Sequence, residues 1–400
     1  MSKIGLIIIL IISLTIPANV FASDDIQISN TSTKIDFPNS LTFNIKATSS
    51  STITRIRLRY EVDKLTFASV FAESWPEFEP AKTVSTRWTW DMRKGSLPPG
   101  ARVTYWWVIE NSTGSKLVTA KETLSYDDTR HKWQNISQNK VNIYWYQGNR
   151  SFADELLKSA LDAISHLARD TGASLENPVS FYIYANYLDL RGSLVAPEEW
   201  TGGVAYAGFN IISIGISTSN LEWGKKAVAH ELGHLITHQI TFSPYGANLP
   251  PWLDEGLAMH AEGEQGKNDR DALIKSIENG RISTLRSLSS PFSADAEEAY
   301  YAYAQSQSVV EFLINKFGKD KLNGLLLLLK DGDSMDEALV KVYGFDLTGL
   351  DEAWLEYVAS KSTVKNTYQE TPVCNIHELL NTVGPLLSRI TSSQLIICGA

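Results

Sequence analysis

The chain has 400 residues, of which 43% are hydrophobic and 20% are charged. This length is enough for two or three domains with packed cores. The formal net charge of −9 argues against a nucleic-acid-binding protein, because no basic excess is available to neutralise phosphates.

The N-terminus has the pattern of a secretory signal peptide. Lys3 precedes an apolar run from Ile4 to Ile16, and Pro17 ends the run. In Val20-Phe21-Ala22, small residues then stand at the positions that a signal peptidase reads. The run is 13 residues long, whereas a spanning helix needs about 20. We therefore expect residues 1–22 to be removed, leaving a secreted or extracytoplasmic chain without a transmembrane span. An uncleaved signal that tethers the chain to a membrane is the alternative.

Residues 23–131 have the pattern of an all-β domain. Apolar and polar residues alternate from Leu41 to Ala47, and less strictly from Ile53 to Val62 and from Arg102 to Ile109. Short turn-forming segments separate these stretches. Several short strands at this spacing predict a β-sandwich. Its tryptophans are more typical of a packed core than of a carbohydrate platform.

Residues 132–365 read as a second, α+β domain whose C-terminal half is mostly helical, so that the chain is multidomain. Apolar residues at helical spacing predict an amphipathic helix at Phe152–Ala168. Three strands are predicted at Val141–Tyr146, Val179–Tyr184 and Gly208–Ser217.

A buried helix is predicted over residues 221–240. Ser219 and Glu222 have the spacing of a capping box, and Ser243 with Pro244 ends the run. Apolar residues on several sides of the helix predict that it is buried, while Gly233 weakens it.

The segment from His230 to His234, which reads HELGH, carries the sharpest chemical signal. Residues four apart lie on one face of a helix, so both imidazoles can reach one Zn²⁺ ion. Glu231 would then lie near the open position of the metal, where it can take a proton from bound water. A buried helix whose histidines are satisfied by hydrogen bonds is the alternative.

A second helix, begun by proline at Pro250–Glu262, supplies the third ligand. Glu255 lies 21 residues after His234, which leaves room for a turn and an antiparallel return. Two histidines, one glutamate and an open fourth position are the ligand set of a catalytic zinc site, whereas a structural site has four protein ligands. The sequence therefore predicts one Zn²⁺ ion.

The motifs HELGH and WLDEGLA resemble those of the gluzincin zinc metallopeptidases, in particular the peptidase MA-like family. The resemblance covers about residues 140–360. It implies a zincin-like fold and a peptide or protein substrate. It also implies metal ligands at His230, His234 and Glu255, with Glu231 as base and proton shuttle.

The resemblance implies two further elements of the site. In related gluzincins a tyrosine donates a hydrogen bond to the oxyanion, and this role falls on Tyr303, with Tyr300 and Tyr301 as competitors and core packing as the alternative. A strand beside the zinc helix pairs with extended peptides in this fold. Gly208–Ser217 fits that place, and an ordinary interior strand is the equal alternative.

The sequence departs from the family pattern at one position. Met259 stands where some gluzincins have a carboxylate that orients a metal-binding histidine. Asp254, Glu262 or a backbone carbonyl are the candidates for this task. His238 and His260 receive little weight as metal ligands, because three protein ligands suffice.

Residues 366–400 form a C-terminal tail that contains both cysteines, Cys374 and Cys398. Export permits a disulfide bond between them, and two unpaired thiols are the alternative.

Together these features predict a secreted zinc-dependent peptidase that uses Glu231 as general base. A catalytically silent extracellular binding module with a degenerate peptidase domain is the alternative, although a purely structural zinc ion has no use for Glu231. A GAMEN-like exopeptidase motif does not occur, which weakly favours an endopeptidase. The oligomeric state is not predicted.

Overall fold

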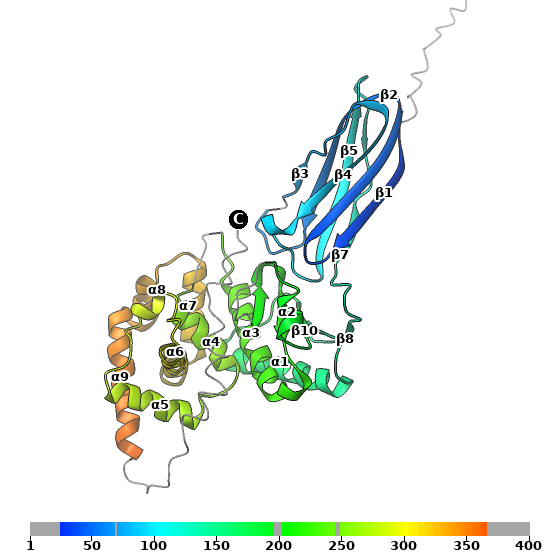
Figure 1. The fold of residues 1–400 in the computed structure, drawn as a ribbon. Coiled ribbons are helices and arrows are strands. Elements are labelled where there is room, and N and C mark those ends of the chain that lie inside the picture. The colour runs from blue at the N-terminus through cyan, green and yellow to red at the C-terminus, as the bar shows by residue number, and fades with distance from the viewer. Residues whose placement is uncertain (1–24, 69, 196–201, 245–248, 366–400) are drawn as a thin grey trace, which may run out of the picture.

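The computed structural model describes residues 25–68, 70–195, 202–244 and 249–365. The predicted signal peptide and the tail with both cysteines lie outside the described residues. Figure 1 shows a β-region formed by the first part of the chain and, beside it, a region that combines a sheet with many helices.

Seven antiparallel strands build the N-terminal region of the described chain. They are β1 (Ile26–Asp36), β2 (Ser40–Val62), β3 (Ala72–Ser74), β4 (Ala81–Asp91), β5 (Ala101–Asn111), β6 (Lys116–Val118) and β7 (Glu122–Tyr126).

The long strand β2 takes part in both layers of this region. Its first half pairs with β1 and β4, and its second half pairs with β3 and β5, with register shifts between Thr48 and Ile53. Phe43 of the first half packs edge-on against Tyr105, with ring centroids 4.9 Å apart. Tyr105, however, is paired with Tyr60 in the second half of β2. The sheet therefore folds onto itself into the predicted sandwich, with β2 shared by the two layers.

The second region contains a five-stranded sheet in the order β11-β12-β10-β9-β8. β9, β10 and β12 are parallel, and the outer strands β8 and β11 are antiparallel to their neighbours. The bounds are β8 (Gln134–Gln138), β9 (Val141–Trp145), β10 (Val179–Tyr184), β11 (Gly203–Tyr206) and β12 (Ile211–Gly215).

The strand predicted at Gly208–Ser217 is an interior strand. β12 lies between β10 and β11, so its backbone groups are used within the sheet on both sides. The proposal that this segment pairs with a peptide is therefore wrong. β11, a four-residue strand that the alternation pattern did not reveal, lies at the end of the described sheet instead.

Helices pack on this sheet and continue the chain to residue 365 (Figure 1). They are α1 (Arg150–Thr171), α2 (Tyr187–Arg191), α3 (Leu221–Thr241), α4 (Pro251–Ala261), α5 (Lys267–Glu278), α6 (Ala296–Phe317), α7 (Lys319–Lys330), α8 (Met335–Tyr343) and α9 (Leu347–Lys365). Buried apolar residues of the sheet and of α1, α3, α4 and α6 belong to one core. None of the described helices is both long and apolar enough to cross a membrane.

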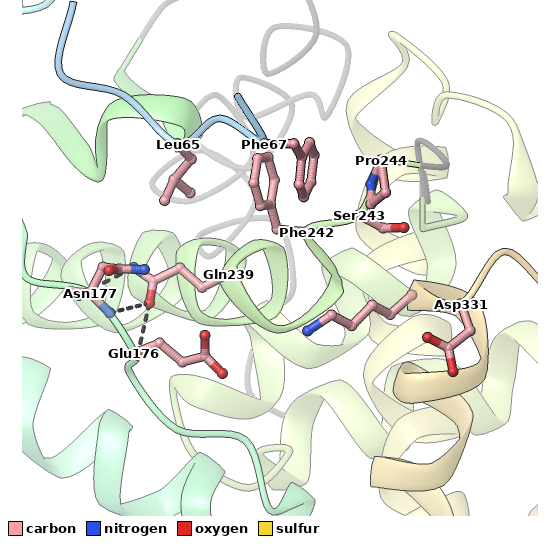
Figure 2. A pocket seen from close by; sticks show the side chains of 10 residues that line it. Leu65, Phe67, Glu176, Asn177, Gln239, Phe242, Ser243, Pro244 and Asp331 are labelled. Atoms are coloured by element: carbon pink, nitrogen blue, oxygen red, sulfur yellow. Dashed lines mark hydrogen bonds between the residues drawn. The ribbon is translucent and has the colours of Figure 1, made fainter. Parts of the chain in front are cut away.

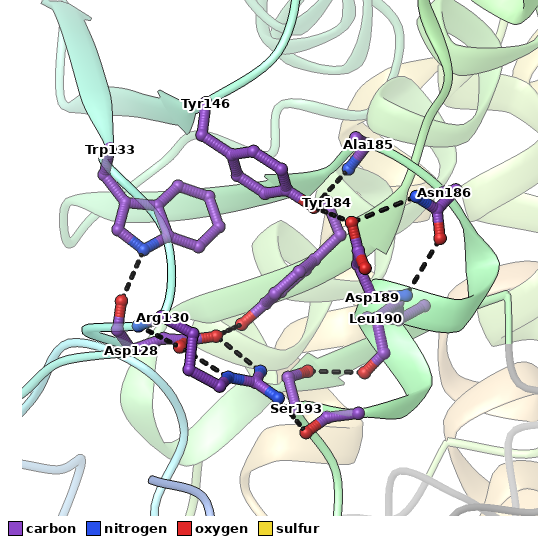
Figure 3. Close-up of polar contacts among 11 residues, drawn as sticks. Asp128, Arg130, Trp133, Tyr146, Tyr184, Ala185, Asn186, Asp189, Leu190 and Ser193 are labelled. Carbon is purple, nitrogen blue, oxygen red and sulfur yellow. Dashed lines mark hydrogen bonds and ion pairs between the residues drawn. The ribbon is translucent and has the colours of Figure 1, made fainter.

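The segment that joins the two regions is held by a polar network around Asp128 (Figure 3). Tyr184 of β10 donates a 3.0 Å hydrogen bond to the Asp128 carboxylate, and the Trp133 indole donates to its backbone carbonyl at 2.8 Å. Burial alone would raise the pKa of Asp128, but hydrogen bonds from Arg130 outweigh this effect and lower it. The junction is thereby anchored to the second sheet.

A second contact between the regions lies at the end of α3 (Figure 2). The ring of Phe67, from the loop after β2, stacks on Phe242 with centroids 4.2 Å apart. The backbone amide of Leu65 donates to the carbonyl of Gly208 at 2.7 Å. Leu65, Phe67 and Phe242 line a pocket at the C-terminal end of α3, beyond the HELGH segment.

Candidate metal centre

The helix α3 carries HELGH and is buried over most of its length, as its apolar pattern predicted. The predicted capping box is wrong, because Asn220 occupies the N-cap position without a side-chain hydrogen bond. A 3₁₀ turn at Thr218–Asn220 leads into the helix instead. The helix ends at Thr241, just before Ser243 and Pro244.

Two glycines allow the helices of the site to approach closely. A Cβ on Gly233 would lie 2.8 Å from the Cα of Ala258 in α4, and one on Gly256 would lie 2.5 Å from the carbonyl oxygen of Ser306 in α6. Only glycine leaves room for such backbone contacts. The residue that weakened the helix prediction is therefore the one that lets α3 and α4 meet.

The structure brings His230, His234 and Glu255 together. The two Nε2 atoms lie 3.2 Å apart, and each lies 3.4 Å from Oε2 of Glu255. Ligand atoms held about 2.0–2.1 Å from a tetrahedral ion lie about 3.3–3.4 Å from one another. The three side chains are at most 3% exposed, and Oε2 of Glu255 has no hydrogen-bond partner among the described residues. The donor set and its spacing thus fit a zinc ion.

A different carboxylate faces each histidine on the side away from this cluster. Oε1 of Glu262 lies 2.9 Å from Nδ1 of His230, and Oδ2 of Asp254 lies 3.1 Å from Nδ1 of His234. Such partners fix the ring orientation of a ligand histidine and make it more basic. The sequence named both acids but did not choose between them. The structure uses both, while Met259 contributes its backbone carbonyl to Gln307.

Glu231 lies on the same helix and is 3% exposed. Burial raises the pKa of its carboxyl group. A Cβ on Gly203 of β11 would lie 3.5 Å from Oε1 of Glu231, so this carboxylate lies against the outer strand of the sheet. It is not part of the three-residue cluster.

Of the three candidate tyrosines, Tyr303 lies nearest to the cluster. It is 3% exposed, and its ring centroid lies 6.5 Å from that of His230. Burial, followed by the charges of Glu255 and Glu231, raises its pKa. The hydroxyls of Tyr300 and Tyr301 donate to other acids, Asp269 and Glu297, at 2.6 and 3.2 Å.

His238 and His260 are not part of this cluster. His238, one turn after His234, is not part of the cluster, and burial lowers its pKa. His260 belongs to a second group with His166 and Asp170, which the spacing of the sequence had not singled out.

Comparison with known proteins assigns this chain to a family. The sequence profile of the Peptidase MA superfamily matches residues 159–360, which include every residue of the cluster. No curated protein matches this chain.

Two solved structures are similar to this chain at low sequence identity. Legionella pneumophila aminopeptidase A in complex with aspartic acid is 12% identical with a TM-score of 0.38, over 84% of this chain and 50% of that one. An aminopeptidase N family protein from Idiomarina loihiensis is 11% identical with a TM-score of 0.27, over 87% of this chain and 74% of that one. The chain thus spans about half the length of the Legionella protein. The family match covers half of the chain and carries the assignment: this chain belongs to the Peptidase MA superfamily.

Proposed function

We propose that this chain is a zinc-dependent peptidase, with His230, His234 and Glu255 as metal ligands and Glu231 as general base. The observation that carries the proposal is the set of three buried ligand atoms 3.2–3.4 Å apart, one of which makes no hydrogen bond among the described residues. When bound there, Zn²⁺ would polarise the scissile carbonyl and lower the pKa of a bound water.

Glu231 moves the protons of the reaction in this proposal. Its carboxylate is not a ligand, so it can accept a proton from the attacking water and return it to the leaving amine. Its place beside β11 supports this role, because an extended substrate would lie there. Tyr303 donates a hydrogen bond to the oxyanion of the tetrahedral intermediate.

β11 replaces Gly208–Ser217 as the strand that binds an extended peptide. It pairs with β12 on one side and ends the described sheet, and Gly203 lies against Glu231. Backbone hydrogen bonds to such an outer strand provide affinity without demanding one sequence.

The secretory signal at residues 1–22 and an extracytoplasmic place for the mature chain remain part of the proposal, as do domains at 23–131 and 132–365. An endopeptidase is favoured by the missing GAMEN-like motif. Hydrolysis of peptides with blocked and with free N-termini distinguishes the two modes.

The test compares the parent with Glu231→Gln, in zinc content and in hydrolysis of casein and a blocked peptide library. We expect one zinc ion at this cluster in both proteins and a loss of activity of about 10²–10⁴-fold in the variant. Glu222→Gln is the matched control, because Glu222 lies in the first turn of the same helix with its side chain 84% exposed. Undiminished activity of Glu231→Gln would remove the base. Zinc binding without hydrolysis by the parent would favour the binding module.

A further inference from the structure

A second cluster of potential metal ligands lies where the last turns of α1 meet the end of α4. His166 and Asp170 are four residues apart on α1, so they share one face of the helix, and His260 reaches them from α4. Oδ2 of Asp170 lies 3.3 Å from Nε2 of His260 and 3.4 Å from Nε2 of His166. The three ligand atoms all lie within 4.8 Å of one another.

His260 is buried without satisfied ring nitrogens. It is 3% exposed, and among the described residues neither its Nδ1 nor its Nε2 makes a hydrogen bond. Nε2 of His166 also lacks a hydrogen-bond partner there, although the two imidazole rings are only 4.4 Å apart between centroids. Leaving a buried polar atom without a hydrogen-bond partner destabilises the folded protein. Two such nitrogens face one oxygen of Asp170, which is the arrangement of three ligands around a metal ion.

From this geometry we propose that His166, Asp170 and His260 form a second metal site, which takes a divalent transition metal such as Zn²⁺. Two imidazoles and one carboxylate suit zinc and its neighbours, whereas Ca²⁺ and Mg²⁺ prefer oxygen ligands alone. The site is open to solvent on one side, because the side chains of His166 and Asp170 are 17% and 20% exposed.

Arg169 is the competitor for this place. Its guanidinium group donates to Nδ1 of His166 at 2.9 Å and to Oδ2 of Asp170 at 3.0 Å. Nδ1 of His166 is then the acceptor, so a neutral ring carries its proton on Nε2. Metal binding at Nε2 moves this proton to Nδ1 and displaces Arg169 toward solvent, where 66% of its side chain already lies.

The metal would fix the position of α4. That helix holds His260 five residues after Glu255, and Asp254 and Glu262 also lie on it or at its end. A metal that joins α1 to α4 would therefore hold in place the helix that supplies the third ligand of the first site. The proposal concerns separate residues and does not depend on peptidase activity.

The experiment measures zinc bound per full-length chain after chelation and dialysis against Zn²⁺. We expect two ions in the parent, one in His234→Gln, one in His260→Gln and none in the double variant. Asp170→Asn provides a second test at a partly exposed, isosteric position and should also bind one ion. Circular dichroism confirms that each variant is folded.

The outcomes separate the two sites. One ion in the parent and none in His234→Gln would overturn the second site and leave the proposed catalytic site intact. Two ions in both His260→Gln and Asp170→Asn would place the second ion elsewhere and overturn the proposal as well. One ion in His234→Gln that is lost on adding Asp170→Asn supports it, whatever the hydrolysis assay shows.

Discussion

The two histidine–carboxylate clusters of this chain are built in the same way but in different surroundings. Each combines two residues four apart on one helix with one residue from α4. In the first cluster all three ligands are at most 3% exposed, and a carboxylate faces the outer nitrogen of each histidine. In the second, two of the three side chains reach solvent, and an arginine touches the outer nitrogen of His166.

The difference shows that a ligand set alone does not decide the chemistry of a metal site. Residue types and helical spacing are similar in both clusters. Among the described residues, the first cluster has a buried acid, Glu231, beside it, and that acid lies against the outer strand β11. Burial strengthens electrostatic interactions, and outer carboxylates orient the ligands. These surroundings suit the first cluster to the proposed catalysis.

The largest effect that sharpens this contrast is expected from Tyr303→Phe. Tyr303 lies beside the first cluster, and the proposed second metal site does not include a tyrosine. Removing one oxyanion donor typically lowers kcat by about 10²–10³-fold. We expect this loss with zinc content unchanged, measured by steady-state kinetics and metal analysis. Tyr301→Phe is the matched control, since its hydroxyl donates to Glu297. Equal kinetics of the two variants would return Tyr303 to a packing role.

A smaller effect is expected from Glu262→Gln, which makes the first cluster more like the second. The amide cannot hold the proton on Nδ1 of His230 as a carboxylate does. Loss of such a partner typically costs about 10–100-fold in metal affinity or activity. Competition with a chromophoric chelator measures the zinc affinity, with Glu222→Gln as control. An unchanged affinity would show that the contact with Glu262 is incidental.

The smallest effect is expected from Arg169→Met, which removes the competing cation of the second cluster. An exposed ion pair is worth about 0.2–1 kcal/mol. Zinc should therefore bind about 1.4- to fivefold more tightly at the second site, as measured by titration calorimetry in the His234→Gln background. Weaker binding would mean that Arg169 orients the ligands and does not compete with the metal.

The sequence was sufficient wherever local periodicity carries the information. Alternation and helical spacing predicted β10 at Val179–Tyr184 and the buried helix α3. Proline predicted the start of the helix that contains Glu255. The pairing of His230 with His234 follows from the helical repeat alone, because residues four apart share a face. The family motifs then identified the superfamily, and the profile match over residues 159–360 agrees.

The tertiary structure decided what depends on contacts between elements. The outer strand is β11 and not Gly208–Ser217, because strand order is set by pairing across the sheet and leaves no trace in the alternation of one segment. Spacing alone could not assign Asp254 and Glu262 to different histidines. His166 and Asp170 had a readable four-residue spacing, but their partner His260 lies 90 residues after Asp170 and meets them only where α1 packs on α4. Proximity of that kind arises from packing, which no local pattern records.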